Sequence, residues 1–284
     1  MSKVAVVTDS TAYIPGYLLK NLDITIIPLH LIWGDENLLD GVDITPKEFY
    51  ARLRTTKIMP STSQPTPHAF LTVYQQLLDD GYDVLSVHIS SKLSGTVSSA
   101  IQAKEMIGES NIMILDSQVT SMALGFPVLK AARAAADGAT LNDCFDIAQK
   151  ACLSSGALFT VDTLEFLHRG GRIGSTAAFL GTALNLKPLL GLIDGKIEAV
   201  EKIRTRNKAI DKMVDTFIKQ QAGYTSVSIA VVHADCPADA MRVLEICKNH
   251  ATSLPINEAV ITEVSPVIGT HAGPGTVGIT YTLE

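Results

Sequence analysis

The chain has 284 residues, of which 46% are hydrophobic and 18% are charged, and its formal net charge is −6 at pH 7. This composition is typical of one large or two ordinary globular domains, and it excludes a disordered chain. The acidic balance argues against nucleic acid as a partner, because nucleic-acid binding depends on basic residues that meet phosphates.

The first residues lead directly into an apolar run at residues 4–7, without the apolar segment and cleavage site of a secretory signal. The chain has four cysteines, Cys144, Cys152, Cys236 and Cys247. They form no C-x-x-C pair and no zinc spacing, so we expect free thiols, no metal site and a cytoplasmic protein. The longest apolar run, residues 177–193, is interrupted by Asn185, Lys187 and Pro188. We therefore expect buried helix and loop there and no stable insertion into a membrane.

In the first half, predicted strands alternate with predicted helices. The strands are expected at residues 4–7, 24–29, 84–89 and 112–115. Two helices are expected to begin after Thr45 and Thr66, where Thr-Pro pairs place proline at the first helical position, and Thr45 and Glu48 predict a capping box for the first of them. This alternation predicts crossover connections and a parallel sheet. Ligands of such sheets bind beyond the carboxyl ends of the strands, where this chain has the polar clusters 9–11, 90–96 and 116–117.

The pattern changes near residue 155, after a predicted helix pair at residues 121–137 and 141–154. Strands are then expected at 157–161, 189–193, 196–203, 227–233, 258–264 and 277–283. Asp194-Gly195 indicates a hairpin, and helices are expected at 206–220 and 237–251. We therefore predict an α/β protein with an N-terminal parallel-sheet domain, residues 1–155, and a C-terminal α/β domain, residues 156–284, over a shared cleft.

Residues 84–107 carry the clearest candidate for a binding site. A buried strand leads through a turn rich in hydroxyl groups (Ser90, Ser91, Ser94 and Thr96) into a helix, and Gly95 permits close approach of a ligand. Hydroxyl groups at a helix N-terminus favour an anion. The same pattern is also typical of a serine N-cap without a ligand.

Two further segments have unusual composition. Residues 60–65 place Ser61, Thr62, Ser63 and Gln64 between two prolines, which favours an extended segment of hydrogen-bond donors outside helix and sheet, or an ordinary surface loop. Residues 269–275 are predicted to form a tight glycine-rich loop around His271, which could bind an anion, transfer a proton or satisfy the loop backbone.

Basic residues form two clusters, at residues 168–173 and 202–206, which contain Arg169, Arg172, Arg204 and Arg206. Arginine suits bidentate contact with carboxylate or phosphate. The sequence has no P-loop, no G-x-S-x-G elbow and no H-E-x-x-H motif.

Short motifs along nearly the whole chain resemble the landmarks of the DegV family, in the same order. They are Asp9-Ser10-Thr11, Asp40-Gly41-Val42-Asp43-Ile44, Thr62-Ser63-Gln64-Pro65, Leu93-Ser94-Gly95-Thr96, Asp116-Ser117, residues 167–173, Lys187-Pro188 and His271-Ala272-Gly273-Pro274-Gly275. The resemblance implies a two-domain DegV-like fold with a ligand tunnel between the domains. It also implies a non-catalytic, fatty-acid-binding subunit of bacterial fatty acid kinase, which works in phospholipid synthesis.

The resemblance implies roles for individual residues as well. The carboxylate of one long-chain fatty acid would be held by Thr62, Ser94 and His271, with Ser63, Gly95 and Thr96 in support. A separate ATP-binding kinase subunit would phosphorylate that carboxylate. The residues expected to contact this partner or the phosphate are Arg169, Arg172, Arg204 and Arg206. No cofactor other than the bound fatty acid is implied.

Two other functions compete with this interpretation. The first is an enzyme that acts on a small anionic or phosphorylated substrate, with Asp9 and His271 as acid and base. The second is a transcriptional regulator with a ligand pocket, although the sequence shows no recognition helix and no basic face.

Overall fold

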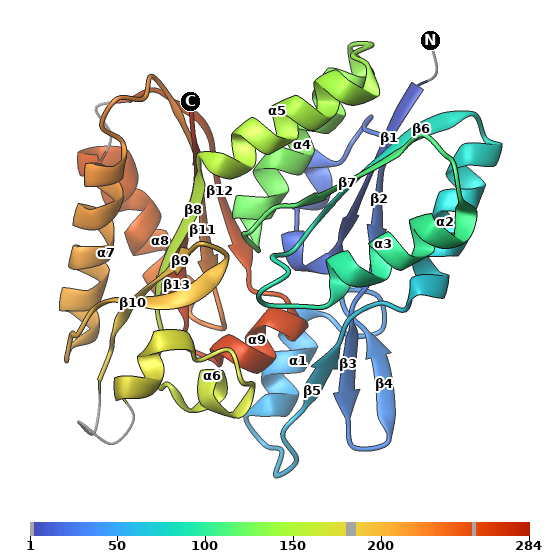
Figure 1. Ribbon diagram of the computed structural model, residues 1–284. Coiled ribbons are helices and arrows are strands. Elements are labelled where there is room, and N and C mark those ends of the chain that lie inside the picture. Colours follow the sequence, from blue (N-terminus) through green and yellow to red (C-terminus); the bar gives the residue numbers. More distant parts are fainter. Residues whose placement is uncertain (1–2, 180–185, 252–253) are drawn as a thin grey trace.

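The computed structural model describes residues 3–179, 186–251 and 254–284, and it has a mixed α/β architecture (Figure 1). The predicted parallel sheet is present in the first half. Its spatial order is β2 (Ile24–Ile27), β1 (Lys3–Asp9), β6 (Tyr82–His88) and β7 (Ile112–Asp116). All three neighbouring pairs run parallel, so the polar clusters that follow β1, β6 and β7 lie at one edge of the sheet.

Helices cover both faces of this sheet. Successive strand residues point to opposite sides, and apolar residues on each side are buried under helices. Val7 and Val84 pack against α2 (Pro67–Asp79) and α3 (Thr96–Ile107). On the other face, the neighbouring strand residues pack against α4 (Met122–Ala136) and α5 (Leu141–Leu153). Threonine caps open α2 and α5, where Thr66 and Thr140 accept hydrogen bonds from the helix backbone.

The second half forms a six-stranded sheet. Its order is β10 (Lys196–Glu201), β9 (Leu189–Ile193), β8 (Ser155–Thr160), β13 (Val277–Leu283), β11 (Val227–His233) and β12 (Ile256–Glu263). Only β11 and β12 pair in parallel, and Asp194-Gly195 closes the predicted β9–β10 hairpin. Helices α7 (Arg206–Gln220) and α8 (Pro237–Ile246) cover the outer face, and a π-helical turn, Cys247–Ala251, extends α8 (Figure 1).

A third sheet corrects two predictions. Its antiparallel strands are β4 (Glu36–Leu39), β3 (His30–Trp33) and β5 (Ser61–Ser63). The strand expected at residues 24–29 therefore ends at Ile27, and the chain enters a different sheet at His30. The segment expected to avoid sheet structure is a strand, because Ser61, Thr62 and Ser63 find backbone partners on β3 that the local sequence does not reveal.

The glycine-rich segment around His271 is also different from the prediction. It forms the last turns of helix α9 (Pro266–Ala272), which Ser265 caps, and only residues 273–275 form a loop. Helix α9 packs against α1 (Pro46–Leu53), whose capping box at Thr45 was expected, and against the short helix α6 (Glu165–Arg169). Proline at the first position of α9 and tertiary contacts outweigh the glycine content.

Short 3-10 turns complete the described chain, at Ser10–Ala12, Gly16–Leu18 and Gly174–Phe179. The apolar run at residues 177–193 begins in the last of these turns and ends in strand β9, at the residues where a strand was expected. Residues 180–185 of that run lie outside the described residues.

All described strands before residue 155 belong to the four-stranded and three-stranded sheets, and all described strands from residue 155 onward belong to the six-stranded sheet. The division into two domains near this residue stays a prediction. The hydrophobic cores cross this boundary. Ala230 and Val260 share a core with α4, and Val232 and Val264 share one with Trp33. The two halves are thus packed together over the cavity described below.

In the described part of the chain, no helix is long and apolar enough to cross a membrane. The cytoplasmic location stays a prediction. All four cysteines are free, as expected, and Cys144 and Cys152 lie buried on α5.

The packing of α9 on α1 predicts a specific intolerance at Gly269. A Cβ atom there would overlap the hydroxyl of Tyr50 and lie 2.9 Å from Cε1 of Phe49. We expect Gly269→Ala to lower the free energy of unfolding by about 1–3 kcal/mol, measured by urea denaturation. Gly16→Ala is the control, because a Cβ at Gly16 has no neighbour within 4 Å. Equal stability of the two variants would contradict this close packing.

Candidate functional site

A cavity lies between the six-stranded sheet and the first half of the chain. Its lining residues come from both halves: from strands of the three-stranded and six-stranded sheets, from helix α9, and from the segments that follow the strands of the parallel sheet. They are Thr11, Leu29, Thr62, Ser63, Gln64, Ile89, Leu93, Ser94, Thr120, Ser121, Ala157, Leu158, Phe159, Leu167, Arg172, Leu192, Ile197, Val232, Val264, Val267, Ile268, His271, Ala272, Thr276 and Thr280. Most of these side chains are apolar. Among the described lining residues, Arg172 has the only permanent charge.

The three residues predicted to hold a carboxylate all line this cavity. Thr62 lies on β5, Ser94 lies in the turn before α3, and His271 lies in the last turn of α9. The Oγ1 atom of Thr62 is 2.7 Å from Nε2 of His271. This hydrogen bond joins residues 209 positions apart in the sequence. It can form only because α9 packs beside β5.

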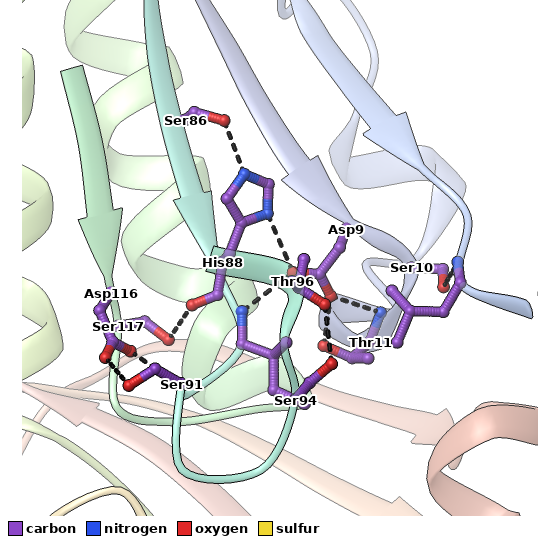
Figure 2. A network of polar contacts seen from close by, with 12 residues as sticks. Asp9, Ser10, Thr11, Ser86, His88, Ser91, Ser94, Thr96, Asp116 and Ser117 are labelled. Carbon is purple, nitrogen blue, oxygen red and sulfur yellow. Dashed lines mark hydrogen bonds and ion pairs between the residues drawn. The ribbon is translucent and has the colours of Figure 1, made fainter. Parts of the chain in front are cut away.

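Ser94 has a different neighbour, since its hydroxyl lies 2.8 Å from that of Thr96 (Figure 2). Helix α3 begins at Thr96 with Gly95 as its N-cap, and among the described residues no side chain caps this end. The predicted serine N-cap is therefore wrong for this helix. The first N–H groups of a helix carry partial positive charge and lack partners within the helix. The turn thus combines hydroxyl groups with a helix N-terminus, as an anion site requires.

The supporting residues lie around the same turn. Ser63 lines the cavity, Thr96 is fully buried, and Gly95 faces the amide of Gln64. A Cβ at Gly95 would lie only 3.0 Å from Nε2 of Gln64. Glycine at this position therefore lets the segment 61–64 approach the start of α3.

The four predicted arginines are not brought together. Arg172 lines the cavity, where its Nε donates to the carbonyl of Leu93 at 3.2 Å and its Nη1 donates to that of Gly170 at 2.6 Å. Arg169 pairs with Glu165 at 2.6 Å within α6.

Arg206 and Arg204 lie at the start of α7. Arg206 is held by Asp239 at 2.6 Å and by Asp162 at 3.2 Å, so this half-buried side chain joins elements of the second half. Arg204 is exposed in a shallow groove with both basic and acidic residues. The four side chains therefore have different environments, and a common role does not follow from their positions.

The environment of His271 favours the neutral imidazole. Burial, and then the positive charge of Arg172, lower the pKa of His271 to about 4. Its Nδ1 atom is buried without a hydrogen-bond partner in the described structure and lies against the backbone of Gly170, where a Cβ atom would overlap it. At neutral pH this ring therefore acts as a hydrogen-bonding group and adds no charge to the cavity.

A buried polar network underlies the cavity (Figure 2). Asp9 accepts hydrogen bonds from the N–H groups of Thr11 and Ile89 and from the Thr11 hydroxyl, and it lies 3.0 Å from Nδ1 of His88. The chain of contacts continues from His88 through Ser86 to Tyr74. Because its hydroxyl is engaged by Asp9, Thr11 has no free donor to offer a ligand.

This network corrects the proposed pairing of Asp9 with His271. Asp9 is 0% exposed, and it is not among the described residues that line the cavity. Both of its carboxylate oxygens are engaged, by Thr11 in the turn after β1 and by His88 and Ile89 at the end of β6. Asp9 is thus placed to order the strand ends and not to exchange protons with a bound substrate.

The sequence reasoning missed several lining residues. Gln64 and Leu93 adjoin predicted site residues, so their position next to a motif could have identified them. Phe159 on β8 and Val267 on α9 line the cavity only because of tertiary packing, and no local signal distinguishes them from other core residues. No group of three or more His, Cys, Asp or Glu side chains in the described ranges could hold a metal ion.

Comparison with known proteins shows what this arrangement resembles. A family model described as "Uncharacterised protein, DegV family" matches residues 3–284. A DegV domain-containing protein of Streptomyces coelicolor is 37% identical, and the match covers 97% of each chain.

Solved structures agree with the sequence comparison. The chain is similar to a DegV family protein from Thermus thermophilus, described as binding fatty acid, with a TM-score of 0.92, 35% identity and coverage of 99% of this chain and 100% of that one. It is also similar to DegV of Bacillus subtilis, described as a fatty acid binding protein, with a TM-score of 0.88, 34% identity and full coverage of both chains.

The buried environment of His271 predicts how its imidazole titrates. We expect its imidazole to stay neutral until about pH 4 in ¹⁵N-edited NMR, because burial and Arg172 both disfavour the cation. Arg172→Gln should raise this pKa only part of the way to the ordinary value, since burial remains. In the unfolded chain this histidine takes up a proton near pH 6.5, whereas in the folded protein it stays neutral down to about pH 4. The free energy of unfolding should therefore fall as the pH is lowered from about 6.5 to 4. An ordinary titration in the wild-type protein would contradict the burial described here.

Proposed function

The chain belongs to the DegV family, whose model covers nearly its full length, and we propose that it binds one long-chain fatty acid and presents the carboxylate to a partner kinase. The kinase would transfer the γ-phosphoryl group of ATP to a carboxylate oxygen, which releases ADP and leaves an acyl phosphate for phospholipid synthesis. In this role the protein is the lipid-binding subunit and the partner supplies the catalysis.

One observation carries the proposal. Three neutral hydrogen-bonding side chains, Thr62, Ser94 and His271, lie on the wall of one mainly apolar cavity. This combination fits a ligand with a small polar head and a long apolar body. The solved relatives described as fatty-acid-binding have the same fold over their whole length, which supports this choice of ligand.

The apolar lining supports the acyl chain as the main source of affinity. Burial of each CH₂ group contributes roughly 0.8 kcal/mol, so a sixteen-carbon tail could contribute on the order of 10 kcal/mol before the costs of binding. A fatty acid free in water would expose that surface. A protein carrier is therefore a physically reasonable route from a source of fatty acid to an enzyme.

Neutral donors also suit a carboxylate that must react. A buried ion pair with lysine or arginine would be costly to break and would reduce the nucleophilicity of the carboxylate. Hydroxyl groups, a neutral imidazole and the start of α3 can orient it without neutralising its charge. We propose that Thr62, Ser94 and His271 bind the carboxylate and that Ser63, Gly95 and Thr96 support this geometry.

We propose different roles for the arginines, because their surroundings differ. Arg172 reaches the cavity and is suited to stabilise phosphate charge as it develops near the carboxylate. Arg204 is exposed and suited to an acidic surface of the kinase. Arg169 is exposed next to Glu165 and could join the same contact, whereas Arg206 would act through its ion pairs with Asp162 and Asp239.

The carboxylate site can be tested with conservative variants. Thr62→Val and Ser94→Ala each remove a hydroxyl donor to a charged acceptor, which contributes about 1.5–3 kcal/mol, so affinity for palmitate should fall about tenfold or more. Thr280→Val is the control, because that hydroxyl also lies at the cavity but donates to the carbonyl of Ala230. Calorimetric titration of delipidated protein measures the affinities.

Mass spectrometry of an organic extract tests the ligand itself. We expect a fatty acid in stoichiometric amount from purified wild-type protein. If the extract contains none and added palmitate does not bind, the proposed ligand is wrong. If palmitate binds the hydroxyl variants as tightly as wild type, the ligand stands but the assigned carboxylate site does not.

Delivery can be separated from binding with Arg204→Ala. Its palmitate affinity should stay within about twofold of wild type, because the side chain is exposed outside the cavity. The rate of acyl phosphate formation with the kinase subunit and ATP should fall. Added salt should also lower this rate for the wild-type protein, because it screens the contact between Arg204 and the kinase. Arg133→Ala is the control, since this arginine pairs with Glu258 and does not line the cavity. A loss of lipid affinity in proportion to the lost rate would assign Arg204 to the lipid site.

A further inference from the structure

The segment Asp40-Gly41-Val42-Asp43-Ile44 is a recognisable motif to which the proposed function gives no role. It follows strand β4 and forms a tight turn, in which Asp40 and Ile44 make an isolated bridge and Gly41 has a φ of 76°. The backbone N–H of Asp40 donates to the carbonyl of Leu29 at 2.9 Å. The turn thereby directs the Asp40 side chain inward, where it is 2% exposed.

The carboxylate of Asp40 joins the two halves of the chain. Its Oδ2 accepts a hydrogen bond from Oγ of Ser10 at 2.7 Å, and its Oδ1 accepts one from the backbone N–H of Val267 at 3.3 Å. Ser10 is fixed in turn, because its Oγ accepts from the N–H of Leu29 at 3.0 Å. Asp40 therefore links the first turn of α9, through Val267, to Ser10 at the end of strand β1.

Helix α9 connects the residue that Asp40 holds, Val267, to His271 in the candidate site. It has seven residues, and Val267 and His271 stand four positions apart on the face that lines the cavity. Residues at this spacing are neighbours on one side of a helix. A shift of the first turn would therefore also move the imidazole, which lies 2.7 Å from Thr62.

Other contacts restrict α9 on its remaining sides. The Tyr50 hydroxyl donates to the carbonyl of Val264 at 3.0 Å, Gly269 lies against Tyr50, and Gly273 lies against Phe166. These contacts fix the distance of the helix from α1 and α6. The hydrogen bond from the Val267 N–H to Asp40 instead fixes the first turn of α9 relative to the end of strand β1, where Ser10 holds Asp40.

We propose that Asp40 is a positioning residue, which sets the place of His271 relative to Thr62 by holding the first turn of α9 across the interface between the two halves. The proposal rests on the proposed function for its binding readout, since His271 is there a carboxylate ligand. It also has a readout that needs no fatty acid, namely the titration of His271 itself.

The environment of Asp40 makes asparagine an informative substitute. Burial raises the pKa of Asp40 to about 7, and hydrogen bonds from Ser10, Val267 and Ser265 partly oppose that rise. The neutral side chain is therefore tolerated at this position. Asparagine has nearly the same shape and keeps an oxygen that can accept from Val267, whereas alanine removes the acceptor altogether.

A double-mutant cycle tests the proposal with delipidated full-length protein and palmitate as the probe. Asp40→Ala should weaken palmitate binding about tenfold, the effect of one lost hydrogen bond to a charged group, and Asp40→Asn should restore most of it. In a His271→Ala background, Asp40→Ala should cause almost no further loss, because Asp40 acts through the imidazole. Ser10→Ala is a milder change, which removes the hydrogen bond to Oδ2 of Asp40. It should also weaken palmitate binding only when His271 is present.

A control separates positioning from general loss of stability. Phe217→Leu changes the core between α7 and the six-stranded sheet, where Phe217 packs 5.1 Å from the ring of Tyr281 and does not line the cavity. It should lower stability without changing palmitate affinity. If it weakens binding as much as Asp40→Ala does, the effect is one of stability and the proposal is wrong.

The NMR titration of His271 gives the independent result. Asp40→Ala should raise the pKa of His271 from its lowered value, because a displaced ring becomes better solvated, and Phe217→Leu should leave that pKa unchanged. Equal losses of affinity in both His271 backgrounds, or an unchanged His271 titration in Asp40→Ala, would overturn the proposal. If wild-type protein binds no palmitate, the proposed function fails, and the titration still decides whether Asp40 positions the ring.

Discussion

Helix α9 belongs in sequence to the half that forms the six-stranded sheet, yet it packs against α1, β3 and β5 of the other half (Figure 1). The hydrogen bond between Thr62 and His271 depends on this packing, as do the apolar contacts that Val264 makes with the core around Trp33. The close approach is possible because Gly269 has no side chain to separate α9 from Tyr50. One wall of the cavity and one of its polar groups therefore exist only when the two halves are docked.

The chemistry of the cavity follows from how its charges are arranged. Asp9 and Asp40 are buried next to it, but each is engaged by hydrogen-bond donors and neither lines it. His271 has a lowered pKa and is neutral at pH 7. The cavity thus presents hydroxyl groups, an imidazole and the start of α3 to a ligand, with Arg172 as its permanent cation among the described residues. Such a surface accepts an anion and leaves its charge largely unpaired.

Much of the fold could be predicted from local patterns. The capping box at Thr45, the hairpin at Asp194-Gly195 and the strands β11 and β13 agree with expectation because their signals lie within a few adjacent residues. Strand β5 and the helical character of α9 were missed. Both depend on partners more than 25 residues away in sequence, and local propensity is too weak to overcome such contacts.

The sequence by itself determined the class of fold and the alternation of strands and helices in the first half, because these depend on local patterns. It also marked the segments that contain Thr62, Ser94 and His271 by their unusual composition, and the resemblance to the DegV family gave these three residues their expected role. Only the tertiary structure decided that these three line one cavity, that Asp9 is buried away from it, and that the four arginines have different surroundings. The physical reason is that hydrogen bonding, burial and pKa depend on neighbours that folding brings together from distant parts of the chain, and periodicity along one segment contains no information about those neighbours.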